Sequence, residues 1–409
     1  MTPSVSMDNM AKTVLFLLKR VDCNDGVASH LETLILGLKE NGWRIILCTG
    51  PVEAPHATEN RYNSMKESIL DWIVLANISS TNAIVSVCKE IVGIIKSYDI
   101  DVLHIHGLSL VPQAIMIRML TGVRMAASYH TSAQYANCQR SIRKLPIVAH
   151  MKYVLLLHLC RPDYIIVFSA ENYHFFANLC RYPVRHVVKI RLGVDTDHFR
   201  PPRPAERERA RTELALAPRD IAIVLPGRVD WNKGHDLLIE AAMALAKEYP
   251  ALSLRCLFPG SLSEAESVVR FIAEKLANET HVNGNMLTFL GHVEDVRQIY
   301  FAADIAVLPS RHEGFGLVVA EAMACGLPVI RTPSGGFEDQ IVEGVNGFGI
   351  PFNDVAALAA KIAALFDESV RHRMGLAALE HSKKFDCKKM IADTEALYGR
   401  LMSRRAHGL

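Results

Sequence analysis

Two glutamates stand on either side of a Gly-Phe-Gly turn in the stretch SRHEGFGLVVAEAMACGLPVI at residues 310–330. Glu313 precedes the turn, and Glu321 lies in an apolar run that predicts a helix from about residue 317 to 325. At about 1.5 Å per helical residue, their carboxylates are on the order of 10 Å apart, a separation that could span a pyrophosphate. A capping carboxylate followed by a solvated one is the alternative. An unpaired carboxylate in so apolar a run is costly, so we expect Glu321 to meet a ligand hydroxyl or an internal donor.

The turn also offers backbone donors. Phe315, Gly316 and Leu317 stand where the predicted helix begins, and the first N–H groups of a helix have no partner within it. These groups and the helix dipole favour a negatively charged ligand at that end. We therefore expect the three N–H groups to face the same anion as the two glutamates.

A second anion-binding pattern occurs in LPGRVDWNKGHDLLIEA at residues 225–241. Arg228 and Lys233 lie between Gly227 and Gly234, in a loop that joins a predicted strand to a predicted helix. An arginine fork and a lysine point charge beside a helix N-terminus suit phosphate groups. Taken singly, each cation is more simply a solvated surface charge. The flanking glycines favour the anion site, because they let the backbone approach a ligand closely.

Composition limits the classes of protein to consider. The 409 residues exceed one ordinary core and indicate two domains. The 45 Lys plus Arg nearly balance the 43 Asp plus Glu, so the overall charge does not indicate a nucleic-acid partner. Nine scattered cysteines without a CxxC pair favour a reducing cytoplasm over a disulfide framework or a zinc ribbon. The apolar run at 153–160 is much shorter than the roughly 20 residues of a spanning helix, so we expect no transmembrane segment.

Short apolar runs alternate with helical patterns through most of the chain, which is typical of βαβ units and parallel sheets. TVLFLL, RIILC, DVLHIH, RMAASYH and YIIVFS predict strands before residue 200, and IAIVLPGR, LSLRCLFPG, MLTFLGH, IAVLPS and LPVIRT predict strands after it. A charged, proline-rich stretch separates the two sets. We predict an α/β fold of two Rossmann-like domains that face each other across a ligand-binding cleft. The predicted parts are an N-terminal domain at 1–195, a linker at 196–216, a C-terminal domain at 217–384, and a C-terminal helix at 385–409 that could cross back to the first domain.

GRVDWNKG and HEGFGLVVAEAMACGLPVI resemble the phosphate loop and the E-x7-E element of retaining, nucleotide-sugar-dependent glycosyltransferases with the GT-B fold (group 1, family 4-like). The order of RLGVDTDHFRP, FPGS, FLGHVEDV, PSGG and EGVNGFGIP extends the resemblance over nearly the whole chain. It implies transfer of a hexose-type sugar from a nucleoside diphosphate sugar to an acceptor hydroxyl, in synthesis of surface polysaccharide, lipopolysaccharide or glycolipid. It also places the acceptor in the N-terminal domain and the nucleotide sugar in the C-terminal domain.

The resemblance carries over to individual residues. Arg228 and Lys233 would hold the donor diphosphate and assist its departure. Glu313 would contact the transferred sugar together with the backbone of residues 315–317, and Glu321 would bind the ribose hydroxyls. Gly26, in DCNDGVASH, corresponds to an N-terminal glycine loop in which relatives often have two adjacent glycines. An acid usual in relatives falls on Asp339 and not on Glu338, and neither is assigned a role.

Histidines raise the question of a metal. His130, in ASYHTSAQY, matches a histidine that lies near the reacting centre in relatives, where it could orient the donor sugar or transfer a proton. With His104 and His106, which share one strand face, it suggests a metal site that lacks a fourth ligand and a second-shell carboxylate. DxD patterns at 99–101 and 195–197 are better explained structurally. We expect no metal and no other cofactor, and we favour a UDP-sugar over a GDP-sugar as donor.

Other functions and partners stay open from the sequence. A sugar-nucleotide epimerase, a phosphorylase, or a non-catalytic partner that binds glycan or lipid could share this scaffold. The segment at 138–161 combines Arg140, Arg143 and Lys144 with apolar residues, which suggests peripheral association with the inner face of an anionic membrane. A core-facing helix with a basic solvent side explains it equally well. The expected partners are a nucleotide-sugar donor and a glycan or lipid-linked acceptor, without nucleic acid.

Overall fold

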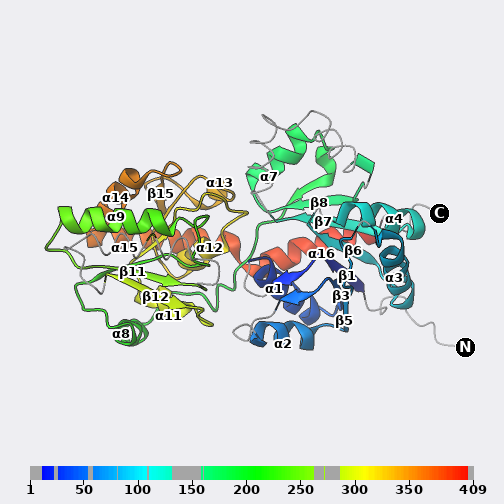
Figure 1. Ribbon diagram of the computed structural model, residues 1–409, viewed down its shortest axis with the longest axis horizontal. Coiled ribbons are helices and arrows are strands. Elements are labelled where there is room, and N and C mark those ends of the chain that lie inside the picture. Colours follow the sequence, from blue (N-terminus) through cyan, green and yellow to red (C-terminus); the bar gives the residue numbers. More distant parts are fainter. Residues whose placement is uncertain are drawn as a thin grey trace, which may run out of the picture.

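Figure 1 shows a computed structural model of the chain, in which two α/β halves lie side by side. The structure describes residues 12–22, 26–53, 59–80, 82–107, 110–130, 158–159, 161–261, 271 and 286–403. The predicted basic and apolar segment at 138–161 falls almost entirely outside these residues. Within the described residues, no helix combines the length and the hydropathy needed to cross a membrane.

The N-terminal half is built on a parallel sheet of seven described strands. Its inner strands are buried on both faces, as their continuous apolar sequences predict: all six side chains of TVLFLL are buried. Its carboxyl edge presents the ends of β6 and β7, where His106 and His130 lie. In sheet order the strands are β5 (Asp71–Val74), β3 (Arg44–Thr49), β1 (Thr13–Leu18), β6 (Val102–His106), β7 (Arg124–Tyr129), β8 (Tyr164–Val167) and β9 (Val187–Lys189), beside a separate pair β2 (Val21–Asp22) and β4 (Val52–Glu53).

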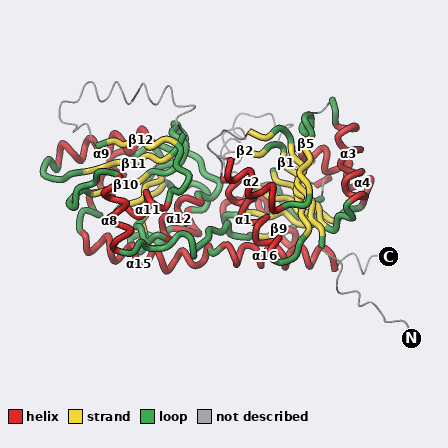
Figure 2. The backbone as a smooth tube through the Cα atoms, turned by 90° about the horizontal axis from the view of Figure 1, so that it is seen from below, coloured by secondary structure: helices red, strands yellow, loops and turns green. Residues whose placement is uncertain are grey.

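Helices cover both faces of this sheet (Figure 2). The first helix follows the predicted i, i+3, i+4, i+7 pattern and buries Leu31, Leu34, Ile35 and Leu38. The predicted glycine after it, Gly42, has a φ of 83°, the left-handed conformation that commonly ends a helix. The helices of this half are α1 (Gly26–Glu40), α2 (Glu59–Ser68), α3 (Ile84–Ser97), α4 (Val111–Thr121) and α7 (Ala170–His174).

The C-terminal half repeats the architecture around a six-stranded parallel sheet. In sheet order its strands are β12 (Leu287–Gly291), β11 (Leu254–Pro259), β10 (Ile221–Val224), β13 (Ile305–Leu308), β14 (Val329–Arg331) and β15 (Gly347–Gly349). Its helices are α9 (His235–Glu248), α11 (Arg297–Ala302), α12 (Leu317–Ala324), α13 (Phe337–Gln340), α14 (Val355–Ala363) and α15 (Glu368–Ser382). The two predicted Rossmann-like sheets are thus confirmed.

The predicted linker at 196–216 contains a helix, α8 (Pro204–Glu213), that packs on the C-terminal half. The Glu206 carboxylate accepts a 2.7 Å hydrogen bond from the Arg203 N–H and so caps the start of α8. Arg207 and Arg211 then bind the Asp304 carboxylate, at 2.6 and 3.3 Å. The proline-rich, charged stretch therefore contains the start of α8 and an ion-pair network with Asp304, and it also separates the two halves.

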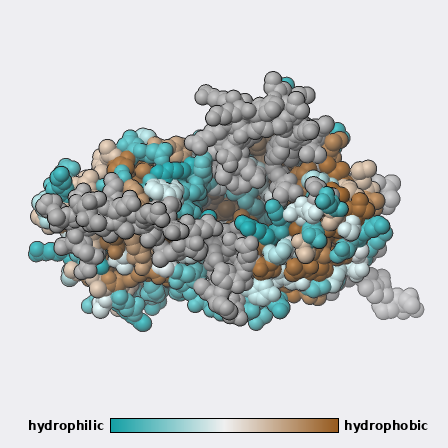
Figure 3. Space-filling model, in the orientation of Figure 1, coloured by the Kyte–Doolittle hydropathy of each residue, from teal (hydrophilic) through white to brown (hydrophobic). Residues whose placement is uncertain are grey.

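The last helix, α16 (Cys387–Ser403), leaves the C-terminal half and lies against the N-terminal half (red in Figure 1). Its Glu395 accepts a 2.8 Å hydrogen bond from the Trp43 indole, and its Tyr398 hydroxyl lies 2.6 Å from His104 Nδ1. The chain thus crosses between the halves twice. On the face seen in Figure 3, hydrophilic and hydrophobic residues are interspersed over the described surface of both halves.

Candidate donor-binding site

The loop after β10 presents two cations beside the N-terminus of α9. Asp230 orders this loop: one of its carboxylate oxygens accepts the Lys233 N–H at 2.9 Å, and the other accepts Arg228 Nε at 3.1 Å. Gly234 has a φ of 77°, and a Cβ there would lie 2.5 Å from the Pro309 carbonyl oxygen. Only glycine therefore lets this loop lie against the loop after β13.

Lys233 reaches across to the E-x7-E element, 80 residues further along the chain. Its Nζ lies 2.5 Å from Glu313 Oε1, and the same oxygen accepts a 2.9 Å hydrogen bond from the Ser310 hydroxyl. The Glu313 side chain is 9% exposed and that of Lys233 is 25% exposed. This ion pair joins the loop after β10 to the loop after β13 and brings the two predicted site residues together.

The Gly-Phe-Gly turn leads into α12, as the sequence predicts. Gly316 has a φ of 79° at the start of the helix, and Phe315 is buried beneath it. Among the described residues, no hydrogen bond uses the N–H groups of Phe315, Gly316 or Leu317 as donors. They are therefore available to an anionic ligand at this helix N-terminus.

Glu321 is partly buried in α12 and has an internal donor, one of the two partners predicted for it. The Tyr300 hydroxyl donates a 2.9 Å hydrogen bond to Glu321 Oε2. Burial raises the pKa of Glu321, and this hydrogen bond and the charge of Arg61 act in the opposite direction. Within the described part of the chain, the other carboxylate oxygen of Glu321 accepts no hydrogen bond.

Arg331, which the sequence did not suggest as a site residue, holds the Gly-Phe-Gly turn by hydrogen bonds. It lies at the end of β14 with no exposed surface. Its guanidinium donates to the carbonyl oxygens of Phe315 (3.2 Å) and Gly335 (2.9 Å) and to the side-chain oxygen of Gln340. Burial lowers the pKa of Arg331 to about 10, so it stays charged at neutral pH. An arginine inside the apolar strand sequence LPVIRT was the available signal.

Asp339, which received no role from the sequence, connects the two halves. Its carboxylate lies 2.8 Å from Lys189 Nζ and 3.4 Å from Arg191 Nε, and it accepts the Ala170 N–H at 3.2 Å. All three donors belong to the N-terminal half: Lys189 ends β9, Arg191 follows it, and Ala170 begins α7. Asp339 is thus an anchor between the halves in this conformation.

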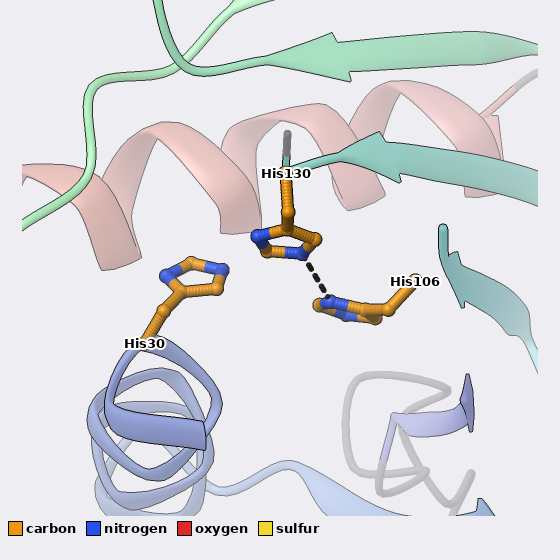
Figure 4. Close-up of side chains that lie close together, drawn as sticks. All are labelled: His30, His106 and His130. Atoms are coloured by element: carbon orange, nitrogen blue, oxygen red, sulfur yellow. Dashed lines mark hydrogen bonds between the residues drawn. The ribbon is translucent and has the colours of Figure 1, made fainter. Parts of the chain in front are cut away.

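The histidines of the N-terminal half group differently from the prediction. His104 has both ring nitrogens paired, with the Tyr398 hydroxyl and, at 2.7 Å, with the Ser128 hydroxyl. His106 Nδ1 and His130 Nε2 share one 2.8 Å hydrogen bond, and His30 completes the group in place of His104 (Figure 4). Burial lowers the pKa of His106 and of His130, and it lowers that of His30 to about 3. His30 occupies the buried face of α1 next to Leu31, which was its sequence signal.

Gly26 and the two DxD patterns lie outside the loops that carry Lys233 and Glu313. Gly26 begins α1, and a Cβ there would meet no neighbour within 4 Å. Asp101 accepts the Thr13 N–H at 2.9 Å, and Asp195 accepts the N–H groups of Asp197 and His198 at 3.0 Å. Both DxD patterns therefore have structural roles.

Because His235 is buried at the start of α9, we expect the protein to lose stability in acid. Burial lowers its pKa from 6.5 to about 4 and outweighs the opposite contributions of Asp230 and Asp236, while the charge of Lys233 acts in the same direction as burial. The unfolded chain therefore binds a proton between pH 6.5 and 4 that the native chain excludes, so stability falls as the pH falls. We expect the free energy of unfolding of wild type, relative to His235→Gln, to fall by about 2 kcal/mol from pH 7 to pH 5. Urea unfolding at both pH values measures this, and equal losses in the two proteins would contradict it.

Solved structures share the fold defined by these two sheets and loops. A glycosyltransferase from Rickettsia africae superposes with a TM-score of 0.79 at 22% identity, over 96% of this chain and 99% of that one. HepE of Anabaena, solved in complex with UDP, superposes with a TM-score of 0.79 at 17% identity, over 95% and 100% of the two chains. The architecture is therefore that of the GT-B fold.

Sequence comparison then gives the family. The family model described as glycosyl transferases group 1 matches residues 206–381, and the one described as glycosyltransferase family 4 matches residues 24–198. EpsD of Bacillus subtilis, which is named as a glycosyltransferase, is 28% identical over 89% of this chain and 91% of its own. A D-inositol 3-phosphate glycosyltransferase of Corynebacterium aurimucosum is 28% identical over 75% of this chain and 73% of its own. This chain belongs to the glycosyltransferases of the GT-B fold, and it is an enzyme of that class.

Proposed function

We propose that the enzyme transfers a hexose-type sugar from a nucleoside diphosphate sugar to an acceptor hydroxyl, with retention of anomeric configuration. The observation that carries the proposal is the ion pair of Lys233 with Glu313 next to N–H groups at the start of α12 that have no acceptor among the described residues. A cation, a carboxylate and a helix N-terminus within one small region suit a diphosphate joined to a sugar. UDP in the structurally similar HepE favours a uridine donor.

Each site residue has a proposed task. Arg228 and Lys233 stabilise the negative charge that develops on the leaving diphosphate. Glu313 exchanges its ion pair with Lys233 for contacts with the transferred sugar, and Glu321 accepts a ribose hydroxyl with its second oxygen. In the N-terminal half, Gly26 at the start of α1 lets the backbone come close to the donor. His130 orients the sugar from the end of β7.

We also propose that transfer needs no metal ion, because the cations Arg228 and Lys233 can supply the charge that a divalent ion would provide. The acceptor is proposed to be a surface glycan or a lipid-linked glycan. WaaG, described as acting in lipopolysaccharide biosynthesis, has the same fold with a TM-score of 0.68 at 16% identity. Liposome flotation of wild type and of an Arg140, Arg143, Lys144 triple alanine variant tests membrane association, which equal binding by both proteins would contradict.

Product analysis tests the proposed reaction. The enzyme is incubated with radiolabelled UDP-glucose or GDP-mannose and a bacterial glycolipid extract, with and without EDTA. We expect label in a larger product, stoichiometric release of nucleoside diphosphate, and equal rates in both buffers. An epimerised sugar or a phosphate-dependent sugar phosphate would indicate the epimerase or the phosphorylase instead. Donor binding without turnover on any acceptor would indicate a non-catalytic partner.

A further inference from the structure

Three histidines converge at the carboxyl edge of the N-terminal sheet. His30 comes from α1, His106 ends β6, and His130 follows β7. One ring nitrogen from each lies within 4.8 Å of the other two, and the three rings face a common centre (Figure 4). Residues from three separate elements thus offer three nitrogen donors at one place.

The hydrogen bonds of this cluster are incomplete. Among the described residues, the cluster contains one internal hydrogen bond, which is 2.8 Å long and joins His106 Nδ1 to His130 Nε2. His30 Nδ1 and His106 Nε2 are buried and have no partner among the described residues. His104, on the same strand face, has both of its nitrogens paired. An unsatisfied buried polar atom costs about 1–3 kcal/mol, so two in one cluster indicate a missing ligand.

The walls of the cluster are apolar. The Phe168 ring lies 5.2 Å from that of His30 and 4.7 Å from that of His130, and the Phe16 ring lies 5.4 Å from that of His106. His30 is 2% exposed and His106 is 5% exposed. Among the residues that the structure describes, no carboxylate belongs to the group of potential ligands. Nitrogen donors among aromatic rings suit Zn²⁺ and its transition-metal neighbours and do not suit Mg²⁺ or Ca²⁺.

We infer that His30, His106 and His130 bind one Zn²⁺ ion, with a fourth coordination position left to water or ligand. Zinc with three histidines and an open position is an established coordination mode. Zn–N bonds of about 2.0–2.1 Å put tetrahedral ligand atoms about 3.4 Å apart, so the rings must shift by less than about 1.5 Å.

Zinc at this position has a consequence that rests on the proposed function. It binds His130, which the proposed transfer reaction needs to orient the sugar. Zinc therefore inhibits an enzyme whose transfer step needs no metal. The binding site itself does not depend on that function, and it is tested by binding alone.

The test uses the whole protein, freed of metal by chelator and titrated with Co²⁺ and then with Zn²⁺. We expect one Co²⁺ per chain with the visible absorption of a tetrahedral site, and displacement of that absorption by Zn²⁺. His30→Gln and His106→Gln should each weaken binding by more than the roughly 10–100-fold typical of losing an outer-shell contact. Circular dichroism confirms that the variants fold, and His130→Ala, at the least buried member, provides a third variant.

His186→Gln is the matched control, because this histidine binds the Asp163 carbonyl oxygen at 2.7 Å, outside the cluster. It should bind Co²⁺ as wild type does. A wild type that binds no Co²⁺, or a binding that survives in all three cluster variants, overturns the site. If Co²⁺ binds through the cluster and transfer activity is absent under every condition, the metal site stands and the proposed function fails.

Discussion

Lys233→Ala is expected to lower the turnover number of sugar transfer by about 10²–10³-fold, which is the usual effect of removing one group that stabilises developing negative charge. Lys233 Nζ is the cation that the structure places closest to Glu313, at 2.5 Å. Its loss removes positive charge where the diphosphate leaves. Because a quarter of the lysine side chain is exposed, the fold should tolerate the change. Initial rates at saturating donor, with thermal unfolding of the same samples, measure both effects.

Two further variants show why turnover falls. Lys361→Ala removes an exposed lysine of the same half that pairs with Glu343 at 3.0 Å, and it should leave turnover unchanged. Lys233→Ala with Glu313→Gln removes the unpaired carboxylate as well as the cation. If that double variant recovered activity, the defect would come from the stranded Glu313 charge. A Lys233→Ala enzyme with near-normal turnover would refute the phosphate role.

Arg331→Met is expected to destabilise the protein by about 3–5 kcal/mol, the cost of breaking a buried, hydrogen-bonded charge network. The methionine fills part of the space but donates nothing. The carbonyl oxygens of Phe315 and Gly335 would stay buried without their partner. Urea unfolding followed by circular dichroism measures the loss. Where the variant folds, the Michaelis constant for the donor should rise, because the turn before α12 is no longer held.

Arg371→Met is the matched control for this prediction. Arg371 also donates to two carbonyl oxygens, those of Leu365 and Phe366, at 2.7 and 2.8 Å. This site is only partly buried, so water can replace the lost donor, and we expect a destabilisation below about 1 kcal/mol. Equal losses in the two variants would show that the Arg331 network adds nothing beyond ordinary arginine contacts.

Local patterns predicted the architecture well. Buried strands such as TVLFLL and the helix after Gly316 depend on periodicity and turn chemistry, which neighbouring residues determine. The glycines around Arg228 and Lys233 indicated the loop, and the structure shows the reason at Gly234, where backbone meets backbone.

Contacts between distant segments were the part that the sequence could not supply. The partner of Lys233 is 80 residues away, and the donor to Glu321 comes from α11, 21 residues earlier. The position of His30 on the buried face of α1 was visible in the sequence, but its proximity to His106 and His130 depends on the packing of separate elements. Arg331 stood out in its apolar strand sequence, but its partners, such as the carbonyl oxygens of Phe315 and Gly335, lie in other segments that only the fold brings together.

Calorimetric titration with UDP and GDP tests the central claim, that the loops after β10 and β13 hold a nucleoside diphosphate. Wild type should bind one of the two nucleotides at a single site. Lys233→Ala should bind it at least about 10-fold more weakly, a change of about 1.4 kcal/mol. Lys361→Ala should bind it as wild type does. The account would be contradicted if wild type bound neither nucleotide, or if wild type and Lys233→Ala bound the nucleotide with equal affinity.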